Sequence, residues 1–216
     1  MEYMLVRSRR KSVAIKILPD GRVLVKSPKK CSIKIIDAFL KEKADWIEKC
    51  KNKLKENSEI FADFYSLKKL MVFGIGYDII DDGKNYHVGE YIIKHTKSSN
   101  LKSVLKKFLH SLINEYINVR CYEISKTYGF TYKSITIISA NKKWGSCDSY
   151  KNLRFNYKLS MLPKRLIDYV ICHELCHTKK LNHSKEFWDL LEDMGYNRVE
   201  IKKEFAKYNF VLGVFK

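Results

Sequence analysis

The segment that decides the fold runs from Cys172 to His183 and reads CHELCHTKKLNH. It holds three of the six histidines in a chain of 216 residues. Because residues four apart lie one turn apart on the same face of a helix, His173 and His177 can reach a single metal ion. Glu174 follows about 100° further around the helix, where it can approach a metal-bound water without being a ligand. This spacing predicts a metal site on a helix.

A third histidine strengthens that prediction, because a catalytic zinc usually has three protein ligands and a water. His183 lies six residues after His177, just past Asn182, a residue type that tolerates the left-handed backbone of a turn. Carboxylates further along the chain are alternative third ligands, but the spacing favours His183. Those alternatives are Glu186, Glu192, Asp193 and Glu200. The residues therefore predict one Zn²⁺ ion held by His173, His177 and His183, with Glu174 as the general base that activates a zinc-bound water.

The segments on either side of this helix are predicted to form both helices and strands. Pro163 suits the first position of the histidine-bearing helix, and Ser184 can cap a further helix that runs to Met194. An apolar stripe predicts a long helix from residue 101 to about Tyr128, which Gly129 would end. Strands are predicted at 134–138 and at about 153–159, with shorter strands between 70 and 95.

The N-terminal segment SVAIKILPDGRVLVKSP alternates apolar and polar residues on both sides of Pro19-Asp20-Gly21, which predicts a β-hairpin. Residues 32–57 then show apolar side chains at helical spacing and predict a helix with a basic outer face. The expected fold class is therefore α+β. We expect a β-rich region with one helix over residues 1–100 and a metal-binding catalytic domain over residues 101–216.

Bulk properties narrow the function classes. The sequence contains no run of 18 or more apolar residues, so a membrane span is not expected. No signal peptide is evident, and a cytoplasmic location is therefore expected. The six cysteines form no CxxC pair and are read as reduced thiols. The formal net charge of +18 predicts attraction to polyanions such as nucleic acid. However, the lysines are spread along the whole chain, which a merely solubilising surface explains equally well.

Several separate motifs together give the chain a resemblance to the YgjP-like metallopeptidase-domain family, a group of small zincins related to the SprT-like and WLM-type proteases. The C-terminal motifs are CHELCHTKKLNHSKEFW, KKWGSC and RFNYKLSMLP. Earlier matches are Arg10-Lys11-Ser12, Asp20-Gly21-Arg22-Val23, Pro28 and Trp46-Ile47. The resemblance covers nearly the whole chain and is weakest around residues 58–100.

This resemblance implies a zincin-like catalytic region with an HExxH active-site helix, preceded by the N-terminal hairpin and helix. It implies that His173, His177 and His183 bind zinc and that Glu174 is the base. It also implies that Phe187 and Trp188 pack the next helix against the site, as core residues. Trp144-Gly145-Ser146-Cys147 should lie in a loop near the metal, where Trp144, Gly145, Ser146 and also Asn156 are candidate substrate-binding residues. A tight turn with an aromatic plug would explain that stretch as well.

Three functions are compatible with these features. The leading one is a zinc-dependent metallopeptidase acting on peptides or proteins. The second is a metal-dependent phosphohydrolase acting on nucleotides, since the many lysines and arginines could hold phosphate, although no phosphate-binding loop is recognisable. The third is a nucleic-acid-associated protease of the SprT-like kind, which would use the basic N-terminal region to reach its substrates. A membrane partner is not expected.

Overall fold

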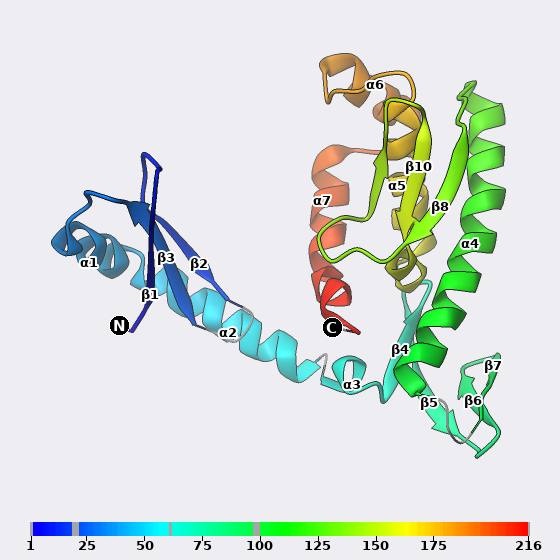
Figure 1. The fold of residues 1–216 in the computed structure, drawn as a ribbon, viewed down its shortest axis with the longest axis horizontal. Helices are drawn as coiled ribbons and strands as arrows, with labels where there is room; N and C mark the ends of the chain where they lie inside the picture. Colours follow the sequence, from blue (N-terminus) through cyan, green and yellow to red (C-terminus); the bar gives the residue numbers. More distant parts are fainter. Residues whose placement is uncertain (1, 19–21, 61, 97–99, 216) are drawn as a thin grey trace. The chain divides into compact units, whose positions relative to one another are not determined.

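A computed structural model describes residues 2–18, 22–60, 62–96 and 100–215. The chain divides into two compact units, Met1–Ala62 and Asp63–Lys216, and each is described by itself. The predicted turn at Pro19-Asp20-Gly21 lies outside the described residues. The mixture of helices and sheets confirms the expected α+β class (Figure 1).

The N-terminal unit is a three-stranded sheet packed against helices. Its strands β1 (Met4–Ser8), β2 (Ala14–Ile17) and β3 (Val23–Pro28) lie in the order β1-β3-β2. The antiparallel pairing of β2 with β3 confirms the predicted hairpin strands, and β1 adds a parallel strand that was not predicted. The alternation places Val23 and Val25 on the inner face, where they are fully buried.

The helical part of this unit differs from the prediction of one helix over residues 32–57. Helix α1 (Ile33–Glu42) begins at Ser32, whose hydroxyl accepts a hydrogen bond from the Ile35 amide. Lys43 leaves helical geometry, and α2 (Ala44–Ile60) follows. The apolar side chains of both helices still face the sheet, and together with it they form the core of the unit. That core contains Val23, Val25, Ile36, Leu40 and Ile47.

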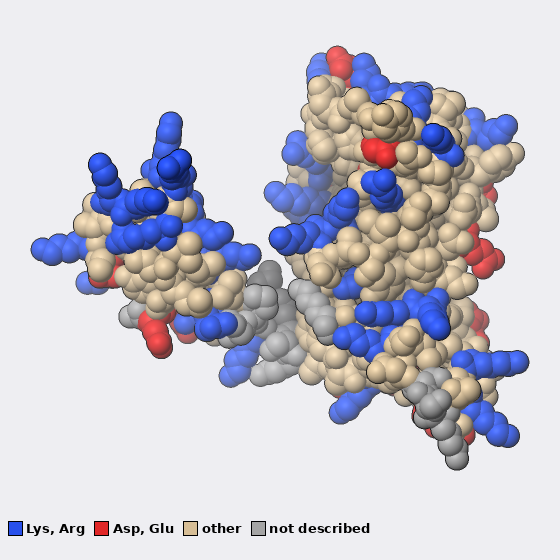
Figure 2. Space-filling view, in the orientation of Figure 1, with Lys and Arg blue, Asp and Glu red and all other residues tan. Residues whose placement is uncertain are grey.

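Charge is unevenly distributed within the N-terminal unit. Residues 3–34 contain ten lysines and arginines but only one acidic residue, so the sheet and its loops carry the positive charge. Lysine and arginine side chains gather accordingly over one part of this unit in Figure 2. Arg7 has a structural use, since its Nη1 donates to the carbonyls of Pro28, Lys29 and Cys31. Positive charge is thus concentrated in residues 3–34, whereas we expected the lysines to be spread along the whole chain.

The C-terminal unit begins with α3 (Ala62–Tyr65) and an antiparallel four-stranded sheet of β4 (Lys69–Val72), β5 (Ile75–Asp81), β6 (Asn85–Val88) and β7 (Tyr91–Lys94). The β4–β5 turn docks on later residues: the Phe73 amide donates to the Ser160 carbonyl over 2.8 Å. Gly74 has φ +85°, and a Cβ on it would come within 2.7 Å of Pro163 Cγ, so only glycine fits. These contacts tie the four-stranded sheet to later residues of the unit Asp63–Lys216.

The second part of this unit contains α4 (Leu101–Tyr128), α5 (Lys164–His177), α6 (Lys185–Asp193) and α7 (Arg198–Lys207). Strands β8 (Ser134–Ile138), β10 (Asn152–Asn156) and β9 (Gly145–Cys147) form a sheet in the order β8-β10-β9, and the 3₁₀ helices η1 (Tyr157–Met161) and η2 (Asn209–Gly213) complete it. In Figure 1 α4 and α7 flank α5, which lies against this sheet. The helices predicted at 101–128 and after Pro163 and Ser184 are confirmed, while α7 was not predicted.

Buried apolar residues hold α4 and α5 together. Those of α4 recur every three or four residues, which gives one continuous apolar stripe along the helix. They are Leu105, Leu109, Ile113, Ile117, Cys121 and Ile124. Gly129, with φ +64°, ends α4 as predicted. In the part of the chain that the structure describes, no helix has both the length and the apolar character needed to cross a membrane.

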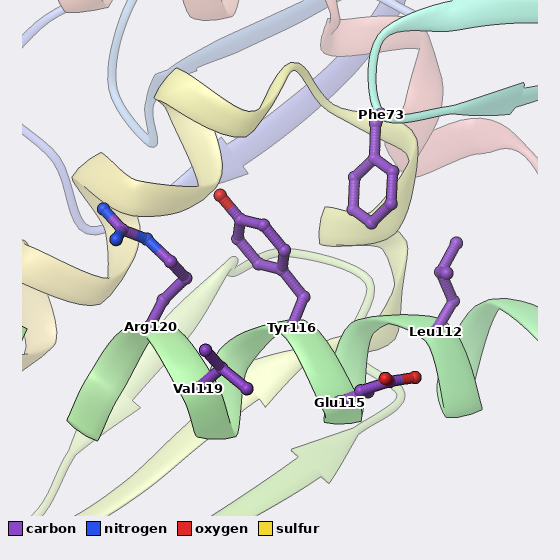
Figure 3. Close-up of a pocket in the computed structure, with 6 residues that line it drawn as sticks. All are labelled: Phe73, Leu112, Glu115, Tyr116, Val119 and Arg120. Carbon is purple, nitrogen blue, oxygen red and sulfur yellow. The ribbon is translucent and has the colours of Figure 1, made fainter. Parts of the chain in front are cut away.

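A polar network also joins α4 to α5. Asp168 accepts a hydrogen bond from the Tyr116 hydroxyl over 2.9 Å and binds the Arg120 guanidinium through both of its oxygens. Tyr116, Arg120 and Phe73 line a hollow of about 300 Å³ beside α4 (Figure 3). His173, His177 and His183 are not among the residues that line it. A bidentate arginine–carboxylate pair of this kind adds directional specificity to apolar packing.

Replacing Asp168 by alanine is expected to destabilise the protein by about 2 kcal/mol, because Tyr116 and Arg120 lose a half-buried common acceptor. The free energy of unfolding in urea measures this. Glu123→Ala is the matched control, since Glu123 pairs with the same Arg120 on the exposed side and should change stability by less than about 0.5 kcal/mol. Equal losses for the two variants would contradict the structural role of Asp168.

Candidate metal site

Helix α5 is a rigid platform for polar groups. Pro163 is its N-cap residue, one position before the predicted one, and the helix runs from Lys164 to His177. Its buried apolar residues pack into the unit, and α5 also contacts β9 and α6. Because most of its surface is buried, the polar side chains that it carries are held in defined positions.

The three histidines of the CHELCHTKKLNH segment converge. His173 and His177 lie on α5, and His183 lies in the loop before α6. One ring nitrogen of each can be chosen so that all lie within 4.8 Å of one another. The Nε2 atoms of His173 and His183 are 3.1 Å apart. Two nitrogens bound to one tetrahedral zinc ion would lie about 3.3 Å apart, so this pair already has a suitable separation.

The protonation of the two helical histidines suits metal binding. Burial, with the charges of His177 and His183, lowers the pKa of His173 to about 3. Burial also lowers the pKa of His177, although its hydrogen bond to Lys180 opposes the shift. That bond runs from Nδ1–H to the Lys180 carbonyl over 3.1 Å, which leaves the His177 Nε2 lone pair free. Neutral imidazoles are the form that binds a metal.

Aromatic rings enclose the cluster. Phe187 is fully buried, and its ring centroid lies 4.6–4.9 Å from those of His173, His177 and His183. Trp188 stacks on His183 with a centroid separation of 5.5 Å. These contacts agree with the packing role expected for Phe187 and Trp188. An apolar wall of this kind lowers the local dielectric around any ion that is bound.

Glu174 lies beside the cluster in a nearly closed environment. It is 5% exposed, and burial raises the pKa of its carboxyl to about 7, while the positive charge of Lys143 acts in the opposite direction. Among the described residues, none forms a hydrogen bond or ion pair with this carboxylate. A carboxylate without a partner in such a site is available for proton transfer.

Gly145 explains how β9 approaches Glu174 so closely. A Cβ at this position would lie 2.6 Å from Glu174 Oε1 and 2.8 Å from its Cγ, closer than real atoms approach. Trp144-Gly145-Ser146-Cys147 was expected in a loop near the metal. The segment does lie beside Glu174, but residues 145–147 form the edge strand β9, paired with β10. Glycine is therefore required for contact between this strand and the helix.

The other candidate substrate residues differ in their positions. Ser146 is partly exposed, and its hydroxyl accepts a hydrogen bond from Lys143 Nζ over 3.1 Å. Trp144 packs on the ring of Phe205 in α7. Asn156 is fully buried; its amide donates to the carbonyls of Ala140 and Lys143, and its oxygen accepts from the Lys158 amide. The polar atoms of Asn156 thus hold the 140–143 loop, and its contact with a substrate stays a prediction.

Sequence reasoning missed two neighbours of the site. Tyr169 lies one turn before His173 on α5, with ring centroids 5.8 Å apart, a spacing that the helix prediction could have revealed. Lys143 lies close enough to Glu174 to influence the pKa of its carboxyl. Lys143 belongs to the KKWGSC motif, but the motif alone did not single it out, because the pairing of β9 with β10 brings it to the site.

The side chains present fit a metal ion. Three neutral imidazoles are a usual ligand set for catalytic zinc. His173 also has a buried Nδ1 without a hydrogen-bond partner among the described residues, and an unsatisfied polar atom of this kind is typical of a site that takes a ligand. The acidic alternatives are engaged elsewhere or absent from the cluster: Glu186 accepts from the Ser184 hydroxyl and lies 3.7 Å from Lys180 Nζ.

Comparisons with known proteins identify the family of this chain. No curated protein matches the chain. A solved structure with similarity is the crystal structure of the metallopeptidase zymogen of Methanocaldococcus jannaschii jannalysin, at 23% identity, a TM-score of 0.36, and coverage of 43% of this chain and 92% of that one. A TM-score this low supports no inference about the present chain. The model of the YgjP-like metallopeptidase domain matches residues 11–208. The chain therefore belongs to the YgjP-like metallopeptidase-domain family.

Proposed function

We propose that the protein is a zinc-dependent metallopeptidase in which His173, His177 and His183 hold one zinc ion and Glu174 is the general base. The convergence of three imidazoles beside a buried, unpaired carboxylate carries this proposal. Membership of a metallopeptidase-domain family supports it.

A zinc ion in this position would supply a Lewis acid that polarises the carbonyl of the peptide bond. The remaining work falls to side chains of this chain. Glu174 takes a proton from the water that attacks the carbonyl carbon, and then passes that proton to the nitrogen of the departing amine. Because burial raises the pKa of its carboxyl to about 7, Glu174 can both accept and release the proton near neutral pH.

Hydrolysis of phosphoanhydrides is the second candidate, and Lys143 favours it. This ammonium lies on the Glu174 side of the site and is held by the Ser146 hydroxyl. A cation there can bind a phosphate oxygen as well as the oxyanion formed from a peptide carbonyl. We rank the peptidase first because the family is one of metallopeptidase domains. Binding of nucleic acid stays a prediction that rests on the charge of residues 3–34 alone.

His177→Ala and His183→Ala are each expected to abolish stoichiometric zinc binding, because two imidazoles retain an ion much more weakly than three. Metal analysis after dialysis against zinc and then metal-free buffer measures this. His110→Ala is the control, since His110 is exposed on α4 and should leave the zinc content unchanged. A wild-type protein without stoichiometric metal after zinc loading would refute the proposed site.

Glu174→Gln is expected to lower peptide hydrolysis by roughly 10²- to 10⁴-fold, because the amide cannot accept the proton, whereas zinc content should remain normal. Cleavage of a mixed peptide library, read by mass spectrometry, measures the activity, and release of phosphate from nucleoside triphosphates is followed in parallel. Glu192→Gln, an exposed change on α6, is the matched control.

The substrate that loses turnover in Glu174→Gln identifies the reaction. Loss of peptide cleavage supports the peptidase, and loss of phosphate release alone supports the second candidate. Activity that persists at wild-type level in the zinc-loaded variant would exclude Glu174 as the base for that substrate.

A further inference from the structure

The third histidine of the cluster is held differently from the other two. His173 and His177 project from a buried helix, whereas His183 is exposed and lies in the loop between α5 and α6. Nδ1 of His177 is fixed by the Lys180 carbonyl. Among the described residues, no hydrogen bond reaches Nδ1 of His183 or of His173, but His173 is held by the buried helix from which it projects. Metal-binding imidazoles are normally oriented by such a bond, so another contact must hold the ring of His183.

Trp188 supplies that contact. Its ring stacks on His183 at an interplanar angle of 25°, and it also meets His173 edge-on at a centroid distance of 6.3 Å. Trp188 lies on α6 and is only partly buried, so its own ring needs support from a neighbour. The guanidinium carbon of Arg198 lies 4.2 Å from the Trp188 ring centroid, well within the range of a cation–π interaction.

The position of Arg198 argues that this contact is specific. Arg198 is the first residue of α7, after the N-cap Asn197. A cation is disfavoured at a helix N-terminus, because the first amides there already present positive partial charge. Among the described residues, Arg198 forms no ion pair with a carboxylate that would offset this. The Trp188 ring is therefore the interaction that the guanidinium gains in this place.

We propose that Trp188 and Arg198 are positioning residues for the third metal ligand: Arg198 holds the Trp188 ring, and Trp188 holds the plane of the His183 imidazole. The inference rests on the proposed function, since it takes His183 to bind the metal. It also gives α7, which contributes no ligand, a part in metal affinity.

The direction in which zinc affinity changes when Arg198 is removed distinguishes this positioning role from an effect of its charge alone. If Arg198 acted only through its charge, removing it would relieve repulsion of the cation and tighten zinc binding. If Arg198 holds the stack, removing it loosens His183 and weakens zinc binding. Loss of supporting residues behind a metal ligand costs about 10- to 100-fold in affinity. We expect about tenfold weaker binding for Arg198→Ala, and a smaller loss for Arg198→Lys, which keeps the charge but not the planar group.

The test is the zinc dissociation constant of the full chain, measured by competition with a chromophoric chelator. The variants are Arg198→Ala, Arg198→Lys, Trp188→Leu and the double change of Arg198→Ala with Trp188→Leu. Because Arg198 acts through Trp188, the double variant should bind zinc no more weakly than Trp188→Leu alone. Lys202→Ala removes an exposed cation from the same helix and should leave the constant unchanged. Thermal unfolding of the metal-free variants shows whether they remain folded.

Each outcome decides a different point. Wild-type or tighter zinc binding in folded Arg198→Ala would overturn the inference, as would losses that add fully in the double variant. His183→Ala is measured beside them: if it binds zinc as well as wild type does, the proposed ligand set fails. If His183→Ala loses zinc while Arg198→Ala does not, the ligand set stands and only the positioning role falls.

Discussion

Contact between α5 and the edge strand β9 is the constraint on which the site depends. Helix α5 places the side chain of Glu174 against β9. Only glycine at position 145 leaves room for it, since a Cβ there would overlap Glu174 Oε1. This close approach removes the carboxylate from water and raises the pKa of Glu174 to about 7. A larger residue at position 145 would separate the strand from the helix. The same contact brings Lys143 and Ser146 to the edge of the site.

On both sides of this contact, buried polar side chains form hydrogen bonds that hold neighbouring segments in place. Asn156 uses both ends of its buried amide on the 140–143 loop and on η1, and so fixes the loop that precedes β9. On the other side, Asp168 ties α5 to Tyr116 and Arg120 of α4. Glu174 and Nδ1 of His173 have no partner among the described residues, as is also true of the buried Oγ of Ser125 on α4. Glu174 and His173 differ from Ser125 in lying together beside a cluster of imidazoles, which is where a ligand is expected.

The ligand cluster combines two kinds of support. Helix geometry sets the relation between His173 and His177, because four residues are one turn. His183 belongs to a loop, and its ring depends on Phe187, Trp188 and the α7 residue Arg198. If the proposed site holds a metal, its affinity would be linked to the packing of α6 and α7 against α5. Charge on the N-terminal sheet is a separate feature of a separate unit.

The sequence by itself determined the local features of this protein. Hydrophobic periodicity identified α4, α5 and several strands, among them β8 and β10. The spacing of His173, His177 and His183 identified a cluster, because such patterns depend on neighbours within a turn or two of chain. Tertiary structure alone decided the rest. It docked the turn at Phe73 on Ser160, and it buried Asn156, whose side-chain amide holds the 140–143 loop. It also brought Lys143 to Glu174 and Arg198 to Trp188, because contacts between distant segments arise from packing, which no local pattern records.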